Sequence, residues 1–574
     1  MSSNNLIVQE YLSSLKEDTE LDYLFPRLIN LMGFRIVQTA KEAKGQSQYG
    51  KDIIAIGKDA SGKKYRWYFE LKGYTDKDIT DKNFSKTDGI RESIIEAKDT
   101  AFNDSSIPEF NNLPIKIVLV HNGVMKANIK PTFDGFITRE FKDGEFEFER
   151  WDIYYLTDLF SRYLFSEYLL LDDESNRLFK KTLAFLDTPD NDYDDFKRLV
   201  NLQFDKIQSV KGRALSKLFA TLGLLETLVF HYSKENNNLI AAKECSKYLI
   251  LYTWSWVLRN NLEKNKTILR EFDILLNIQL SIFNAYFSRT FEVARIEDGL
   301  FAENGNLFER IGYPLRCFEY LDDTVYFCRL RSYIYRNKTN ERSAILLKHK
   351  QKDLIIELVR NNSGFYRPVI DNQSIPIVQL LLFFLNSETR KKDLEFISNY
   401  IFKIINNVTI EKLKHNLFPE IRNDLALVIE AAATGNKPED YCDSSSILLA
   451  ILLELTVVFR SNVMFEEVLK YIDKELSLQI VSIDSEEYDV EQLLFEKHLH
   501  NEYYVDCIER VSDGSKLLKD EMDYEGFKKS IIDKKTPIPK YRTDDAGLPF
   551  LRYLAHSYFK NEILPEEWRV YINK

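Results

Sequence analysis

The sequence predicts an α/β domain at the N-terminus, followed by a large all-α region. Helix and strand patterns alternate over residues 1–172, whereas apolar residues recur at helical spacing over residues 173–574. Only 14 Pro and 20 Gly interrupt the 574 residues, which favours long regular elements. Since a domain usually holds roughly 100–200 residues, we predict at least two domains, and the second is long enough for two subdomains.

The N-terminal domain opens with a helix over residues 20–34, whose leucines recur every three or four positions. Three strands follow, over residues 34–40, 52–57 and 64–74. A short polar loop with a Ser-Gly turn signal joins the last two strands. This part of the chain therefore predicts a helix followed by a three-stranded meander.

The same domain continues with an amphipathic helix over residues 89–102 and a short apolar strand over residues 115–122, of the type buried on both faces. Another strand over residues 146–156 and a helix over residues 156–171 close it. A hairpin followed by a crossover predicts a mixed sheet flanked by helices.

Long helices are predicted for most of the C-terminal region, for example over residues 214–232, 244–262, 375–405 and 444–472. No internal repeat stands out, although an α-solenoid with degenerate repeats stays open. The region is therefore predicted to be all-helical.

Composition narrows the function classes. The chain is 44% hydrophobic and 29% charged, as globular proteins are, and its net charge of −11 gives no global footprint for nucleic acid. Positive charge is local, because residues 51–91 hold ten basic and seven acidic side chains. Any surface that binds nucleic acid is therefore expected near this segment.

The five cysteines lack the C-x-x-C spacing of a zinc ribbon and do not suggest a disulfide framework. The N-terminus has no signal-peptide pattern, and the longest apolar stretch, residues 446–459, is shorter than the ~20 residues of a membrane span. We expect a cytoplasmic protein without a membrane partner. No P-loop motif is present, so any ATP chemistry would come from a separate ATPase partner.

Three charged residues stand where the strand pattern predicts burial. Glu70 and Lys72 lie two apart, so they share one face of a strand, and hairpin pairing can bring Asp52 alongside them. Buried charges are costly unless they are paired or bind a metal. An ordinary Glu–Lys pair on a solvent-facing strand is the alternative interpretation.

These residues carry a resemblance to a known family. A helix ending in "LMGF", a strand, Gly50-Lys51-Asp52, a second strand with Glu70-Leu71-Lys72, then a helix and a strand resemble the PD-(D/E)XK nuclease superfamily, in particular its Mrr-like restriction-endonuclease domain. The resemblance covers residues 1–172 and implies a restriction-endonuclease-like fold. It says nothing of the helical region.

The resemblance implies a role for each residue. Asp52, Glu70 and the backbone carbonyl of Leu71 would bind Mg²⁺, with Mn²⁺ as a substitute, because such cations prefer oxygen ligands. Lys72 would orient the attacking water and stabilise developing charge. An acid on the first helix often joins such sites, and here Glu20 and Asp22 both qualify.

Basic residues beside the predicted site are candidates for DNA contact. Lys51, Lys63 and Lys64 are predicted to touch phosphates, although lysines in a turn are more often simply solvated. His121, at the end of a predicted strand, is interpreted as structural and not as a catalytic base. The pair His498 and His500 has no nearby third ligand and does not predict a metal site.

The resemblance implies a metal-dependent DNA endonuclease, the effector of an anti-phage defence or restriction system. Its helical region would sense a trigger, form a homo-oligomer or bind an ATPase. Two alternatives stay open. One is a catalytically silent adaptor that binds protein partners, and the other is cleavage of RNA by the same residues.

Overall fold

The structure is a computed structural model of the 574-residue chain. It describes residues 8–572 except for 10–11, 14, 16–20, 40–48, 74–75, 88, 143, 145, 164–172, 189–190, 208–211, 302–304, 306, 337–339, 386–387, 471, 473–476, 483–488, 498, 500–503, 510–522 and 534–539.

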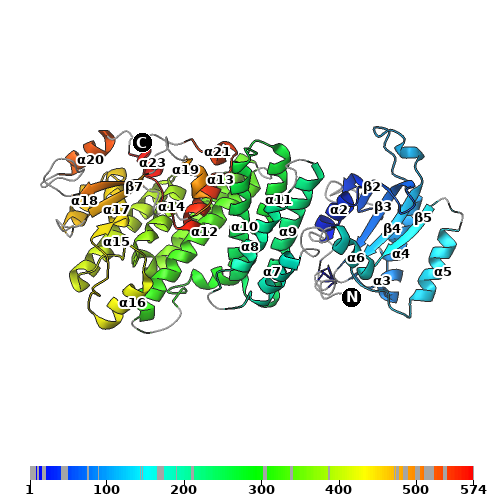
Figure 1. Ribbon diagram of the computed structural model, residues 1–574, viewed down its shortest axis with the longest axis horizontal. Coiled ribbons are helices and arrows are strands. Elements are labelled where there is room, and N and C mark those ends of the chain that lie inside the picture. The colour runs from blue at the N-terminus through cyan, green and yellow to red at the C-terminus, as the bar shows by residue number, and fades with distance from the viewer. Residues whose placement is uncertain are drawn as a thin grey trace. The chain divides into compact units, whose positions relative to one another are not determined.

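Contacts within the chain define two compact units, residues 1–241 and 242–574 (Figure 1). The sheet-containing part of the first unit ends with α6 (Ile153–Tyr163). The same unit also contains three helices, α7 (Asp173–Ala184), α8 (Asp194–Asp205) and α9 (Gly212–Glu235). The change from mixed to helical structure thus falls between α6 and α7, whereas the two compact units divide at residue 241.

A five-stranded mixed sheet forms the centre of the N-terminal part, as predicted. Its strands lie in the order β1 (Arg35–Thr39), β2 (Ile53–Lys58), β3 (Lys64–Lys72), β4 (Ile115–His121) and β5 (Phe146–Trp151). The first three strands pair antiparallel, and β3, β4 and β5 pair parallel. β3 is therefore the central strand, where the hairpin meets the parallel half.

Helices cover both faces of this sheet (Figure 1). α2 (Asp22–Leu31) packs on one face, where the Phe25 ring lies 5.1 Å from that of Phe69. On the other face, α4 (Ile90–Asp99) and α5 (Lys130–Glu140) bury apolar side chains against β3 and β4. Since side chains alternate along β3, Tyr68 faces α4 while Phe69 faces α2.

The structure adds two helices that the sequence did not predict. One is α5, and the other is the five-residue α3 (Asp81–Ser85), which Thr80 and Asn83 stabilise with a capping box. In the last predicted strand, residues 146–156, only Phe146–Trp151 are extended, and α6 begins at Ile153.

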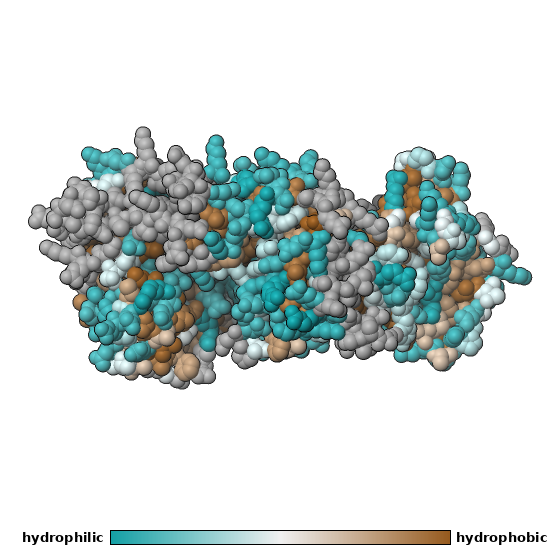
Figure 2. Space-filling model, viewed as in Figure 1, coloured by the Kyte–Doolittle hydropathy of each residue, from teal (hydrophilic) through white to brown (hydrophobic). Residues whose placement is uncertain are grey.

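The second unit is mostly helical, as predicted. Its longer helices are α10 (Leu239–Arg259, which begins just before the unit boundary), α11 (Lys266–Ala294), α12 (Tyr313–Arg336), α13 (Glu341–Asn361), α14 (Ser374–Phe384), α15 (Lys391–His415), α16 (Leu425–Thr434), α17 (Ile447–Val458), α18 (Asn462–Leu469), α20 (Tyr524–Asp533) and α22 (Phe550–Phe559). Among the described residues, six short ones connect or follow them: η4 (Phe308–Gly312), η5 (Ser363–Tyr366), η6 (Asp371–Gln373), α19 (Val490–Leu494), α21 (Arg542–Asp545) and α23 (Glu566–Arg569). Hydrophilic residues cover much of the described surface in Figure 2.

One feature of this unit departs from the all-helical prediction. β6 (Ser445–Ser446), β7 (Ser477–Ser482) and β8 (Tyr504–Glu509) form a small three-stranded sheet. β6 pairs parallel with β7, and β7 pairs antiparallel with β8. The region is therefore helical with a minor sheet and not purely α.

Candidate active site

The predicted site lies where β2 begins and β3 ends, because the two strands run antiparallel. Asp52 directly precedes β2, and its backbone N–H donates to the Phe69 carbonyl at 2.9 Å. Its carboxylate accepts a hydrogen bond from the Leu71 backbone N–H at 2.7 Å. The Asp52 carboxylate therefore contacts the main chain midway between Glu70 and Lys72.

The direction of the Leu71 carbonyl follows from the same pairing. In a strand, the N–H and C=O of one residue point to the same neighbouring strand. Since the Leu71 N–H points to Asp52, its carbonyl also points to that edge, at the end of the β2–β3 pairing. A carboxylate oxygen and a carbonyl oxygen are thus directed to one corner of the sheet.

Glu70 and Lys72 form an ion pair on one face of β3, with 2.7 Å between Oε1 and Nζ. Their side chains are only 6% and 15% exposed. The solvent-facing interpretation of this pair is therefore wrong. A buried pair of this kind adds little net stability, because the cost of removing both charges from water offsets their attraction.

Lys51 is buried in the structure, which makes it more than a solvated turn residue. Its ammonium donates to the Tyr49 carbonyl at 3.0 Å and lies 5.4 Å from the centre of the Tyr68 ring. Burial lowers the pKa of Lys51 to about 8, although the charges of Glu96 and Glu70 raise it. The charges of Glu96, on α4, and Glu70 thus both act on Lys51. The sequence pattern did not predict this arrangement.

Gly50 explains how the chain enters this corner. Its φ of +66° lies in the left-handed region, and a Cβ atom there would come within 1.9 Å of the Ser93 carbonyl on α4. Only glycine tolerates both the conformation and the close approach. Gly50 therefore lets the loop before Asp52 lie directly against α4.

His121 on β4 pairs with Lys72 on β3 in the parallel register and is fully buried. Because Arg150 can only donate, its contact of 3.0 Å makes Nε2 of His121 the acceptor, and Nδ1 donates to the Lys77 carbonyl at 2.9 Å. Burial, aided by the Arg150 charge, lowers the pKa of His121 to about 4. Both ring nitrogens are thus engaged in a neutral ring, which agrees with a structural role.

Lys63 and Lys64 lie elsewhere. They occupy the turn into β3, so Lys64 is six residues from Glu70, or about 20 Å along the strand. Lys63 pairs with Glu147 at 3.6 Å. The structure does not bring these two lysines to the site.

Of the two acids predicted on the first helix, the structure describes only Asp22. Asp22 is the first residue of α2, which packs on the face of the sheet opposite Glu70, and its part in the site stays a prediction. Glu20 lies outside the described residues, as do His498 and His500.

The donor set suits a hard divalent cation. Mg²⁺ usually takes one or two carboxylates and completes its coordination with waters and phosphate oxygens. Asp52, Glu70 and the Leu71 carbonyl supply that number of protein oxygens. Among the described residues, no group of three or more His, Cys, Asp or Glu side chains is arranged as a fuller metal cage.

Comparison of the chain with protein-family models, curated proteins and solved structures finds no match. The resemblance to PD-(D/E)XK nucleases therefore depends on the motif residues, the order of the elements and the geometry described above.

Proposed function

We propose that the protein is a Mg²⁺-dependent endonuclease that hydrolyses phosphodiester bonds of DNA. The observation that carries the proposal is the convergence at one end of β3. There the Asp52 carboxylate contacts the Leu71 main chain, between the members of the buried Glu70–Lys72 pair. Burying these charges costs folding free energy, so the fold does not need them for stability. Hydrolysis of a phosphodiester, by contrast, needs carboxylates that hold the metal ion.

Each group has a defined task in this proposal. Asp52, Glu70 and the Leu71 carbonyl would hold Mg²⁺, which supplies charge neutralisation and a more acidic bound water. The Lys72 ammonium, beside Glu70, orients the attacking water and stabilises the negative charge that grows on the phosphate. The low exposure of the pair strengthens these electrostatic interactions.

The resemblance also supports a cellular role. We infer an effector of anti-phage defence or restriction in the cytoplasm, controlled by its helical region through oligomerisation or an ATPase partner. RNA cleavage and a silent adaptor are the competing outcomes that the following experiments separate.

Cleavage is the direct test. The full-length protein, alone and co-expressed with proteins encoded beside it, is incubated with plasmid DNA and with RNA, in Mg²⁺, Mn²⁺ or EDTA. We expect metal-dependent DNA cleavage, which Lys72→Ala lowers by about 10²–10³-fold. Lys64→Ala, a lysine at the far end of the same strand, is the matched control. Cleavage that persists in Lys72→Ala would place the site elsewhere.

Metal binding tests the site without activity. Calorimetric titration with Mn²⁺ is expected to detect one site that is lost in Asp52→Asn and kept in Asp59→Asn, a half-buried acid in the β2–β3 turn at the other end of the hairpin. A protein that binds no metal and cleaves neither substrate is the silent adaptor.

A further inference from the structure

The helical unit contains a cavity of about 530 Å³ that the proposed nuclease chemistry does not use. Residues of α12, α13 and α14 line it, together with the segment from α21 to α22 and Tyr571. Its volume falls within the ~300–1,000 Å³ that small-molecule sites usually have. All of its lining residues belong to residues 242–574, so the cavity is a feature of one unit.

The lining carries an excess of positive charge. Arg329, Arg336, Lys348 and Lys352 all line the cavity, against a single acid, Asp544. Asp544 already has a cationic partner, because both of its carboxylate oxygens accept hydrogen bonds from the guanidinium of Arg552 at 2.8 Å.

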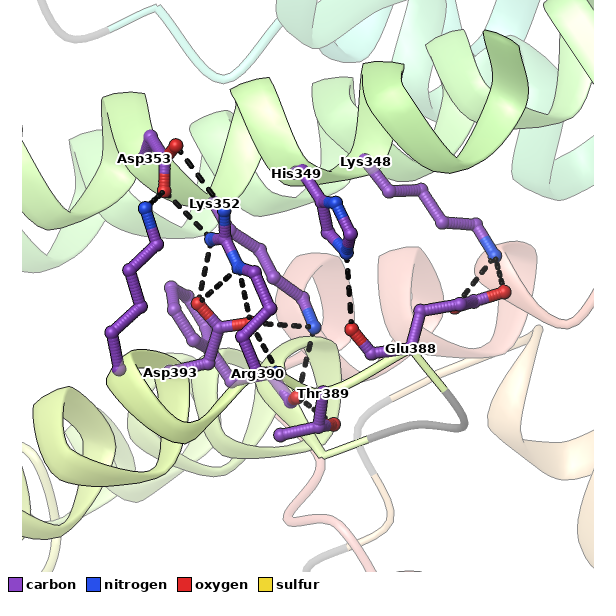
Figure 3. Close-up of polar contacts among 10 residues, drawn as sticks. Lys348, His349, Lys352, Asp353, Glu388, Thr389, Arg390 and Asp393 are labelled. Atoms are coloured by element: carbon purple, nitrogen blue, oxygen red, sulfur yellow. Dashed lines mark hydrogen bonds and ion pairs between the residues drawn. The ribbon is translucent and has the colours of Figure 1, made fainter. Parts of the chain in front are cut away.

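The two lysines are held by a polar network between α13 and the start of α15 (Figure 3). Lys348 pairs with Glu388 at 3.0 Å. The Lys352 ammonium lies 3.5 Å from Asp393, whose carboxylate also accepts hydrogen bonds from Arg390. Arg390 also pairs with Asp353 at 2.6 Å, so the network supplies a carboxylate partner to each lysine and to Arg390.

The two arginines contact aromatic rings, and the Arg329 guanidinium lies 4.1 Å from the centre of the Tyr553 ring. Within the part of the chain that the structure describes, no carboxylate lies within ion-pair distance of Arg329 or Arg336. The Nε of Arg329 is buried and has no acceptor among the described residues, while its Nη2 donates to the Gln379 carbonyl at 3.2 Å. A buried donor without a partner costs about 1–3 kcal/mol, which an anionic ligand would offset.

Aromatic rings complete the lining. Tyr333 and Phe550 lie with their ring centres 5.0 Å apart, and Phe383 and Tyr571 also line the cavity. Arg336 lies 6.0 Å from the centre of the Tyr333 ring. Rings and guanidinium planes both stack on planar heterocycles.

We propose that this cavity binds a nucleotide, with its phosphates at Arg329 and Arg336 and its base against the aromatic wall. A bare anion would leave the rings without a role, and an uncharged aromatic ligand would leave the two arginines without an anionic partner. The proposal concerns binding only and stands apart from the nuclease function.

Titration of the full-length protein tests it, with ADP, GDP, CDP and UDP as probes and with adenosine and inorganic pyrophosphate as half-ligands. We expect saturable calorimetric binding of at least one nucleotide, and weaker binding of both half-ligands. Absence of binding by all four nucleotides overturns the proposal. Pyrophosphate that binds as tightly as the best nucleotide overturns it too, because the rings would then contribute nothing.

Matched variants locate the site. Arg336→Gln should lower the affinity for the most tightly bound nucleotide about tenfold or more, as expected when a hydrogen bond to a charged group is lost. Arg342→Gln, an exposed arginine on α13, should leave affinity unchanged. Ala344→Phe should block binding by filling the cavity without changing its charge. Unchanged affinity in both Arg336→Gln and Ala344→Phe, with unaltered unfolding temperatures, overturns the assignment to this cavity.

Discussion

Both units bury charged side chains, but they balance the charges differently. In the helical unit, buried Asp323 contacts Lys243 and Lys247, and Lys247 also contacts Glu244, so each of these four charges is balanced by an ion-pair partner. At the end of β3, Glu70 pairs with Lys72, whereas the Asp52 carboxylate contacts the Leu71 main chain and Lys51 donates to the Tyr49 carbonyl. The balanced cluster joins helices, whereas the corner of β3 directs charged groups at the main chain, beside the oxygens proposed to bind a metal.

The largest expected effect on stability comes from breaking the balanced cluster. Asp323→Asn leaves buried lysines without a full counter-charge and should lower the free energy of unfolding by about 3–5 kcal/mol. Asp52→Asn keeps an acceptor for the Leu71 N–H and should cost less than about 1 kcal/mol while it abolishes cleavage. Denaturant unfolding of the two variants measures this difference, and equal costs would contradict the comparison.

Acid should destabilise both units through one buried histidine in each. Burial lowers the pKa of His121 to about 4, against the charges of Asp152 and Asp78, and it lowers that of His556 to about 4 as well. Between pH 6.5 and 4 the unfolded histidine binds a proton that the folded one does not. Stability therefore falls with decreasing pH, by at most about 3 kcal/mol for each histidine.

Single variants assign this acid sensitivity to each unit. In calorimetric scans from pH 7 to pH 4, His121→Gln should flatten the pH dependence of the transition of the N-terminal unit only. His556→Gln should do the same for the helical unit. A profile that neither variant changes would mean that carboxylates dominate the acid response.

A smaller effect concerns the glycine beside the site. Gly50→Ala adds a clash with the Ser93 carbonyl to the left-handed strain and should cost about 2–3 kcal/mol. Gly62, at φ +87°, has no atom within 4 Å of an added Cβ, so Gly62→Ala should cost only about 1 kcal/mol. Similar unfolding midpoints for the two variants would show that α4 can shift away from the added Cβ atom at little cost in stability.

The smallest effect is expected far from the chemistry. The double variant Lys63→Ala/Lys64→Ala should change the cleavage rate of bound DNA less than about twofold, because both residues lie about 20 Å along β3 from Glu70. If these lysines contact phosphates, the slope of the logarithm of DNA affinity against the logarithm of salt concentration should become shallower by up to about two. Affinity measured at several salt concentrations separates the two effects.

The sequence predicted the sheet better than the helices around it. Strand alternation, a turn signal and the apolar run of residues 115–121 are local patterns, and they located β2, β3 and β4. α5 was missed because Pro131 and Gly135 hide its helical pattern. The strands β6, β7 and β8 were missed because helices separate them and β6 has only two residues.

Some features of the candidate site were likewise predictable from the sequence, and others were not. The pairing of Glu70 with Lys72 follows from period two alone, so it was predictable. The burial of Lys51 was not, because it depends on the close approach of α4 at Gly50. The cation-rich cavity was not predictable either, because its residues come from segments between Arg329 and Tyr571 that meet only in the folded unit.

The bond between the Asp52 side chain and the Leu71 N–H has a structural consequence. The carboxylate takes the place that a further β2 residue would occupy, so it extends the hairpin ladder by one step. The two acids are thereby locked to the same pair of strands, and the spacing between them is set by backbone pairing instead of by flexible side chains. A shift of the β2–β3 register by one residue would move Asp52 away from Leu71 and so separate the oxygens proposed to bind the metal.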